Sequence, residues 1–244
     1  MDSLTQPPRL NRALIRAHPP KPLRSPHPVA HLDERTLAES MARTLAERPR
    51  TGEGIWIFAY GSLLWKRNFE VAEQRSGIGR GFVRRYCIWD DRDRGTPERP
   101  GLTLALEPAR DGDGACGGAA LRIAEGEFDT ALRAIWRQEM GPGWYRAVWL
   151  DVECPNASSG AVRAVSFAAD HSHPLYVDAP LSEAETAAVI AGACGANGAC
   201  AEYLLDTVED LRRRGLRDME LERLQSAVAA VLLRRTADRD RLLG

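Results

Sequence analysis

Prediction of the fold starts from the run Ile55-Trp56-Ile57-Phe58-Ala59-Tyr60-Gly61-Ser62-Leu63-Leu64-Trp65. The residues from 55 to 60 are all apolar or aromatic, with no polar alternation. This pattern is typical of a short strand buried on both faces, although periodicity alone does not distinguish it from a segment of buried helix. We expect a strand here and build the rest of the prediction around it.

Gly61 and Ser62 end this run abruptly. A glycine at the end of a buried strand has unusual backbone freedom and lets a ligand approach the main chain closely. Successive N–H groups in such a turn can form a small anion-binding concavity, to which Ser62 adds a hydroxyl. An ordinary turn from strand to loop has the same local sequence, so the motif needs support from other residues.

The composition bounds the class of protein. A length of 244 residues suits one large domain or two small ones, and 44% hydrophobic with 27% charged residues is ordinary for a soluble globular protein. The net charge of -1 favours neither nucleic acid nor an anionic membrane as a partner. No apolar run approaches the roughly 20 residues that span a bilayer.

The cysteines are odd in number, widely scattered and without a C-x-x-C pair. They are Cys87, Cys116, Cys154, Cys194 and Cys200. This pattern is against a disulfide framework or a zinc site and predicts a reducing, cytoplasmic location. His171 and His173 lie beside Asp170, but no third ligand is evident, so we expect a turn before Pro174 and no metal.

Residues 1–30 are rich in proline and in basic side chains, with almost no acid. Prolines forbid a long helix, and little in this stretch can bury a core. We considered a transit peptide, and also a short amphipathic segment over Arg9–Ala17, which is too interrupted to favour. We therefore predict a disordered Pro/Arg-rich tail at 1–30. Binding of nucleic acid by this tail would rest on few charges.

Residues 31–244 are predicted to form one domain. Asp33 is a good N-cap for a first helix that ends near Pro49, with a charged outer face. A second helix is expected over Glu125–Met140, and the chain is predicted to be helical from Ser182, which starts a capping box.

Short segments with the composition of strands lie between these helices, separated by Gly, Pro and Asp. They are Gly81–Trp89, Leu102–Glu107, Gly117–Ile123, Tyr145–Glu153 and Ala161–Ala169. Short strands with such breaks favour a closed or nearly closed sheet, so we predict an α+β fold.

Glu139 interrupts an apolar stripe. Phe128, Leu132 and Ile135 follow one face of the predicted helix, and Glu139 occupies the next position on that face. A carboxylate turned inward is costly unless it is paired, and burial raises its pKa, as suits a general acid or base. The alternative is an ion pair at the helix boundary with Arg133, Arg137 or Arg146.

Several blocks, taken in order along the chain, resemble the ChaC-like γ-glutamylcyclotransferases. They are Tyr60-Gly61-Ser62-Leu63, Arg84-x-Tyr86-Cys87, Arg94-Gly95-Thr96, Pro100-Gly101, Trp136-x-x-Glu139-Met140, Tyr145-x-x-x-Trp149, His173-Pro174-x-Tyr176 and Tyr203-Leu204. The resemblance runs from about Trp56 to the last helix and leaves out the N-terminal segment. No single block is specific, whereas their common order is.

The resemblance implies a compact mixed β-barrel with flanking helices and a lyase that acts mainly on glutathione, releasing 5-oxoproline and Cys-Gly without a cofactor. We also expect a monomer or weak homodimer. Its anion-holding loop corresponds to Tyr60, Gly61, Ser62 and Leu63, and its catalytic glutamate corresponds to Glu139. A family tyrosine that helps to hold the γ-glutamyl group corresponds to Tyr203.

This sequence departs from the family pattern at two positions. Gln138 stands where an arginine often precedes the glutamate, and Cys200 stands where an asparagine often precedes the tyrosine. Both put substrate affinity in doubt more than activity. The alternatives to a glutathione enzyme are an enzyme of the same fold acting on another γ-glutamyl amine or dipeptide, and a non-catalytic module binding a small acidic ligand. An inward carboxylate argues against the latter, because it repels anions.

Overall fold

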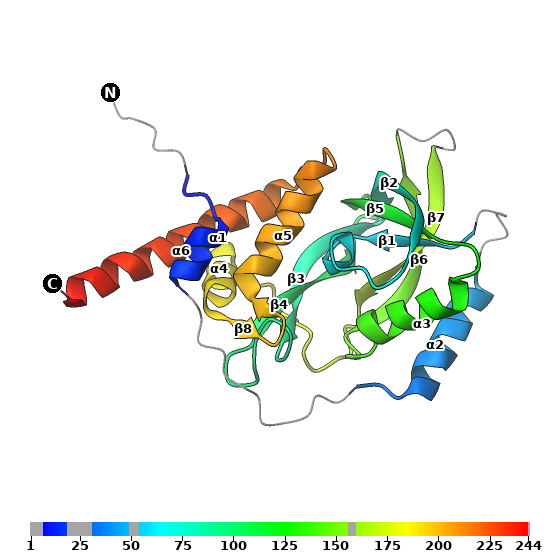
Figure 1. Ribbon diagram of the computed structural model, residues 1–244, viewed down its shortest axis with the longest axis horizontal. Helices are drawn as coiled ribbons and strands as arrows, with labels where there is room; N and C mark the ends of the chain where they lie inside the picture. The colour runs from blue at the N-terminus through cyan, green and yellow to red at the C-terminus, as the bar shows by residue number, and fades with distance from the viewer. Residues whose placement is uncertain (1–6, 19–30, 49–53, 156–159, 244) are drawn as a thin grey trace.

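A computed structural model describes residues 7–18, 31–48, 54–155 and 160–243 of the chain. A seven-stranded sheet, in the order β1-β5-β2-β6-β7-β4-β3, forms its centre (Figure 1). The strands are β1 (Trp56–Ala59), β2 (Val71–Arg80), β3 (Phe82–Asp90), β4 (Gly101–Pro108), β5 (Ala115–Ile123), β6 (Tyr145–Glu153) and β7 (Ala161–Ala169).

The sheet closes into a barrel. Parallel pairing of Ile57 with Val165 joins β1 to β7, so β1, β5, β2, β6 and β7 form a ring. From β7 the sheet continues outward through the parallel pair Leu106 and Ala168 into β4, which pairs with β3 in antiparallel fashion. The predicted mixed β-barrel is therefore confirmed, with the β3–β4 ribbon as an extension of it.

The strand predicted within residues 55–60 forms β1, and every residue of β1 is buried. Phe58 belongs to the core with no exposed surface, and Phe167 on β7 is only 1% exposed. A strand of this kind lies at the centre of a core, which explains why its sequence lacks polar alternation.

The sequence prediction missed β2, because its residues do not look like those of a strand. Gly77 and Gly79 weaken the pattern, but their neighbours leave no room for a side chain. A β-carbon at Gly77 would lie 2.6 Å from the carbonyl oxygen of Glu153, and one at Gly79 would lie 2.8 Å from the ring of Phe58. Close approach of β6 and of the core selects glycine in this strand.

The remaining elements flank the barrel on two sides (Figure 1). On one side lie α2 (Glu34–Ala46) and α3 (Phe128–Glu139). On the other lie α1 (Arg12–Ala17), α4 (Glu183–Gly192), α5 (Cys200–Arg213) and α6 (Met219–Leu243), with the small β8 (Cys194–Gly195) and β9 (Gly198–Ala199) hairpin. A short 3-10 turn, η1 (Ser62–Leu64), follows β1. Of these described helices, none combines the length and the apolar character that crossing a membrane requires.

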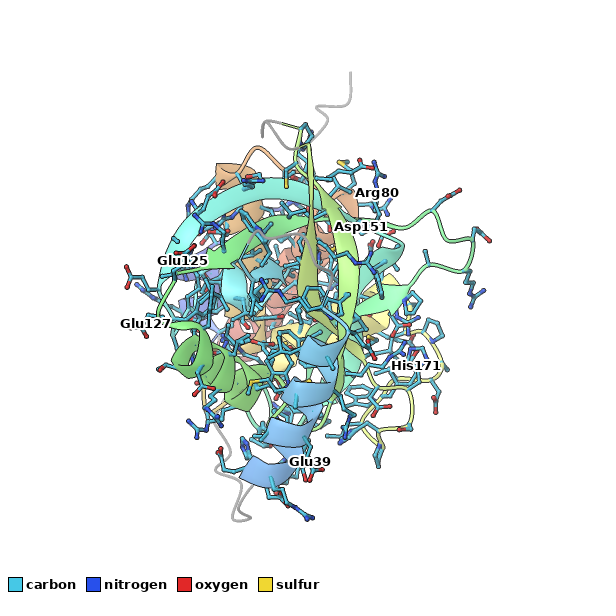
Figure 2. All side chains as sticks on the ribbon, turned by 90° about the vertical axis from the view of Figure 1, so that its right-hand side faces the viewer. Glu39, Arg80, Glu125, Glu127, Asp151 and His171 are labelled. Atoms are coloured by element: carbon cyan, nitrogen blue, oxygen red, sulfur yellow. The ribbon has the colours of Figure 1, made fainter. Side chains whose placement is uncertain are left out.

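Side-chain caps mark the starts of α2 and α4. Asp33 accepts a hydrogen bond from the N–H of Thr36 at 2.7 Å, and Ser182 and Glu185 form the predicted capping box of α4. Helix α2 buries Leu37 and Met41 and turns Glu39 outward, as Figure 2 shows. It is therefore the surface helix that the sequence predicts.

The prediction of disorder over residues 1–30 is wrong for residues 7–18. Asn11 caps α1 through the N–H of Leu14, and Leu10 and Ile15 are 2% and 4% exposed within the main core. Arg12 forms an ion pair with Asp206 on α5 at 2.6 Å. Two apolar side chains at the right spacing are sufficient because α5 and α6 supply the surface that covers them. Residues 1–6 and 19–30 lie outside the described part of the chain.

Candidate active site

Two adjoining cavities open between the barrel and the helices on the α5 side. Both have walls formed by Ser62, Thr103, Glu139, Tyr145 and Tyr203. The inner cavity has a volume of about 30 Å³ and reaches into the barrel, and the outer one has about 100 Å³. Side chains from η1, β4, α3, β6 and α5 thus meet at one place, although they are far apart in sequence.

All of the predicted site residues line the inner cavity. They are Tyr60, Gly61, Ser62, Leu63, Glu139 and Tyr203. The turn after β1, the end of α3 and the first part of α5 bring them together. Their roles in binding and catalysis stay predictions at this point.

Glu139 is the last residue of α3 and faces the cavity. The side-chain amide of Gln138 donates a hydrogen bond to its Oε1 at 2.9 Å. Burial raises the pKa of Glu139 to about 7, and the nearby charge of Asp93 raises it further against the opposing effects of Gln138 and Lys66. A carboxyl group with this pKa exchanges a proton readily near neutral pH.

The structure does not show the alternative role of Glu139, an ion pair at the helix boundary. Arg137 pairs with Glu34 at 2.7 Å, and Arg133 pairs with Asp129 at 2.8 Å. Across the described ranges, Glu139 has no cationic group within 4.0 Å. The position of Glu139 on the apolar face of the helix predicted that its side chain turns inward. The prediction holds because the other residues of that face, including Leu132 and Ile135, pack into the core.

The turn after β1 presents main-chain donors to the inner cavity. Within η1 the first hydrogen bond runs from the N–H of Leu64 to the carbonyl oxygen of Gly61 at 2.9 Å. The preceding N–H groups of Ser62 and Leu63 therefore have no carbonyl partner inside the turn, as is general at the start of a helix. Such N–H groups bind anions when a cavity gives access to them.

Tyr60 and Tyr145 use their hydroxyl groups to hold the barrel. The Tyr60 hydroxyl donates to the carbonyl oxygen of Phe167 at 2.6 Å, and that of Tyr145 donates to Leu104 at 2.9 Å. Burial raises the pKa of both phenols well above their usual value, so both stay protonated donors. The Tyr60 side chain is thus part of the framework behind the turn.

Arg84 supports the turn from behind and was missed as a site residue. It is 8% exposed, donates to the carbonyl oxygens of Tyr60 and Gly117, and pairs with Asp218 at 3.1 Å. The sequence contained a signal for it, the Arg84-x-Tyr86-Cys87 block, but not its partners. Its contacts fix the end of β1 against β5 and the start of α6.

Arg94 is a second missed residue and lies in the wall of the outer cavity. Its guanidinium group lies 5.4 Å from the ring centre of Tyr203 and donates to the carbonyl oxygen of Ala199 at 3.3 Å. The loop that carries it is tightly packed, because a β-carbon at Gly95 would lie 2.0 Å from the N–H nitrogen of Gly101. The glycines of the Arg94-Gly95-Thr96 and Pro100-Gly101 blocks therefore serve to place Arg94.

The two departures from the family pattern have different surroundings. The thiol of Cys200 is completely buried and lies 3.2 Å from the carbonyl oxygen of Leu102, so it packs against β4. Gln138 lines the outer cavity and contacts Glu139 directly.

His171 and His173 do not line either cavity. His171 stacks on Tyr176 at 4.4 Å and lies 3.3 Å from Glu107, and its side chain is on the outside of the fold (Figure 2). The ring of His173 accepts a hydrogen bond from the N–H of Leu175 at 3.1 Å, in the turn around Pro174.

Comparison with known proteins identifies the family of this chain. The model of the ChaC-like protein family matches residues 55–231. This chain belongs to the ChaC-like family. It is 34% identical to the glutathione-specific gamma-glutamylcyclotransferase of Escherichia coli (strain K12), over 80% of this chain and 81% of that protein. It is 31% identical to gamma-glutamylcyclotransferase 2-3 of Arabidopsis thaliana, over 73% of this chain and 90% of the relative.

A solved structure has the same fold. The crystal structure of a yeast gamma-glutamyl cyclotransferase specific to glutathione superposes with a TM-score of 0.64 and 21% identity, covering 73% of this chain and 99% of the yeast chain. The family match begins at residue 55, so α1 and α2 of this ChaC-like chain lie outside it.

Proposed function

We propose that this chain is a glutathione-specific γ-glutamylcyclotransferase, which cleaves glutathione to 5-oxoproline and Cys-Gly. The names of the relatives support the reaction and the substrate. The observation that carries the proposal is the position of Glu139, a carboxyl group with a pKa of about 7 in the same cavity as the main-chain donors of the Gly61 turn.

Glu139 acts first as the base. The α-amine of the γ-glutamyl group is an ammonium ion and has no lone pair with which to attack. An α-amino group has a pKa of about 8, which is much closer to that of Glu139 than to the value of about 4.3 for an ordinary glutamate. Transfer of the proton to Glu139 therefore costs little and gives a free amine close to its own electrophile.

Ring closure and cleavage follow within one molecule. The amine nitrogen attacks the γ-carbonyl carbon and forms the five-membered lactam, and the bond from this carbon to the cysteine nitrogen breaks. Protonated Glu139 passes its proton to that leaving nitrogen, then takes the second proton that the ring nitrogen loses on lactam formation and passes it to the departing amine. The attacking nitrogen thus loses two protons in all, and the cysteine nitrogen gains two and leaves as an ammonium ion. Because nucleophile and electrophile are tethered, orientation supplies much of the acceleration, and the reaction requires no cofactor.

The Gly61 turn and Tyr203 hold the substrate. The N–H groups of Ser62 and Leu63 and the Ser62 hydroxyl bind an anionic oxygen of the γ-glutamyl group. The phenol of Tyr203 stays protonated because burial raises its pKa, and it adds a neutral donor beside Gly61. Arg94, over the ring of Tyr203, adds positive charge to the same wall.

A cytoplasmic location fits the free cysteines, since the described thiols at Cys87, Cys116, Cys154, Cys194 and Cys200 form no disulfide and a reducing compartment keeps them so. We propose a monomer or weak homodimer. Sedimentation of the purified protein over a range of concentrations measures this directly.

The test of the function is product analysis. Purified protein is incubated with glutathione and, in parallel, with γ-glutamyl dipeptides and amines, and 5-oxoproline is measured by mass spectrometry. We expect 5-oxoproline and Cys-Gly in equal amounts from glutathione. Release of 5-oxoproline only from other γ-glutamyl compounds would replace glutathione as the substrate.

A further inference from the structure

Lysine is rare in this chain. Arginine accounts for nearly all of its 33 basic residues, and Lys66 is the one lysine within the described ranges. It lies in the wall of the outer cavity together with Arg94. A lysine carries a compact charge on a flexible stem, whereas the arginine stem ends in a planar fork.

Lys66 is tied to the substrate-holding turn through its main chain. Its N–H donates to the carbonyl oxygen of Ser62 at 2.8 Å, and the preceding Trp65 packs on the ring of Tyr203 at 5.6 Å. Its Nζ donates to Oδ1 of Asn197 at 3.4 Å, in the β8–β9 turn. The ammonium group therefore lies at the exposed edge of the cavity, near the start of α5.

The ammonium group of Lys66 has no carboxylate partner within 4.0 Å among the described residues, and its one side-chain hydrogen bond goes to a neutral amide. None of the ion pairs formed by the described residues includes Lys66 or Arg94. The acids of the same cavity have other partners, since Asp93 accepts from the Asn197 amide at 2.7 Å and Asp90 accepts from the N–H of Asp93 at 2.7 Å.

Lys66 is also coupled to the reacting centre by charge. Its ammonium group acts to lower the pKa of Glu139, which means that the two groups sense each other across the cavity. We place the γ-glutamyl group in the inner cavity, against the Gly61 turn and Glu139, which leaves the outer cavity for the leaving dipeptide. Two extended residues span about 7 Å, so the end of that dipeptide comes to the edge where Lys66 lies.

We propose that Lys66 binds the C-terminal carboxylate of the leaving peptide and so selects γ-glutamyl peptides with a free carboxylate over γ-glutamyl amines and esters. In glutathione this is the carboxylate of glycine. The inference rests on the proposed function and adds to it the residue that distinguishes a peptide substrate. Arg94, which lies against Tyr203, is left for the γ-glutamyl end.

The test compares two substrates on four proteins. Glutathione and its glycine ethyl ester differ only in the carboxylate, and kcat/KM for both is measured with the wild type, Lys66→Met, Lys66→Arg and Arg67→Met. Arg67 is the matched control, because it is also exposed and basic but lines neither cavity.

We expect the wild type to prefer glutathione over the ester by about tenfold, the scale of one charge-assisted hydrogen bond. Lys66→Met should lose about tenfold on glutathione with little change on the ester, whereas Lys66→Arg should keep most of the preference and Arg67→Met all of it. Equal use of both substrates by the wild type, or an equal loss on both in Lys66→Met, would overturn the role of Lys66. Failure of the wild type to act on glutathione would instead defeat the proposed function.

Discussion

The hydroxyl oxygen of Tyr203 lies 2.8 Å from the position that a β-carbon on Gly61 would occupy. Real side chains do not approach so closely, so residue 61 has to be glycine as long as Tyr203 stays where it is. The φ angle of Gly61 is -133°, which other residues also adopt. Contact with a tyrosine from α5, rather than a left-handed backbone, thus explains this glycine.

This contact predicts unequal effects of two neighbouring substitutions. Gly61→Val should nearly abolish turnover of glutathione, because the side chain displaces Tyr203 and blocks the N–H groups of the turn. Ser62→Ala removes one hydroxyl that binds an anionic oxygen and should cost about 1.5–3 kcal/mol in kcat/KM, the scale of one hydrogen bond to a charged group. Kinetics on both folded variants check this, and near-normal turnover by Gly61→Val would exclude a ligand-binding turn.

Gln138 sets the charge environment of Glu139. Because the base must be deprotonated in the free enzyme, kcat/KM should fall as the pH drops through about 7. An arginine at position 138 would place a positive charge beside the carboxylate and lower its pKa by about 1–3 units. The acidic limb of the pH profile of Gln138→Arg should therefore move to lower pH, while an unmoved limb would mean that the limb reports another group.

Glu139 should also destabilise the folded protein at high pH. Its pKa is raised from 4.5 to about 7 on folding, so the folded state binds more protons between these values, and stability falls as the pH rises through them. Glu139→Gln should be more stable than the wild type at pH 8, by up to about 3 kcal/mol, and the gap should close at pH 4. Thermal unfolding of both proteins at pH 8 and at pH 4 tests this difference in stability. An equal difference in stability at both pH values would mean that packing causes it and the titration of Glu139 does not.

The segment at residues 7–18 should contribute stability without contributing to turnover. Ile15→Ala should lower the free energy of unfolding by about 2–5 kcal/mol, because a buried side chain on α1 loses its contacts with the helical layer. Arg12→Ala removes a half-exposed ion pair and should cost about 1 kcal/mol or less. Removal of residues 1–30 should leave kcat/KM of the folded fraction nearly unchanged at low temperature, since none of the described residues of this segment lines either cavity. A large loss in a folded truncated protein would place this segment in the site.

What could be predicted from the sequence depends on how local the signal is. The uniform burial of β1, the cap at Asp33 and the break in the apolar stripe at Glu139 are all visible in short windows, and the structure has each of them. The stripe was decisive, because one helical period places Glu139 on the same face as Ile135.

The features that the sequence prediction missed depend on residues that are distant in the sequence. The glycines of β2 make sense only once β6 and Phe58 fill the space beside them, and Ile15 is buried only because α5 and α6 cover it. Arg84 and Lys66 belong to a class of residue that is usually at the surface, so their positions behind the turn and at the cavity edge follow from tertiary structure alone.

The most direct test of the whole account is the turnover of glutathione by Glu139→Gln. Glutamine has nearly the same size and can hydrogen-bond, so the fold should survive, but it cannot accept the proton of the substrate ammonium. General acid–base groups contribute about 10²–10⁴-fold, and here one residue makes both transfers. We expect kcat, measured by release of 5-oxoproline, to fall at least roughly a thousandfold, with only moderately weaker binding of glutathione by calorimetry. A folded variant within tenfold of the wild-type kcat would remove Glu139 from the mechanism.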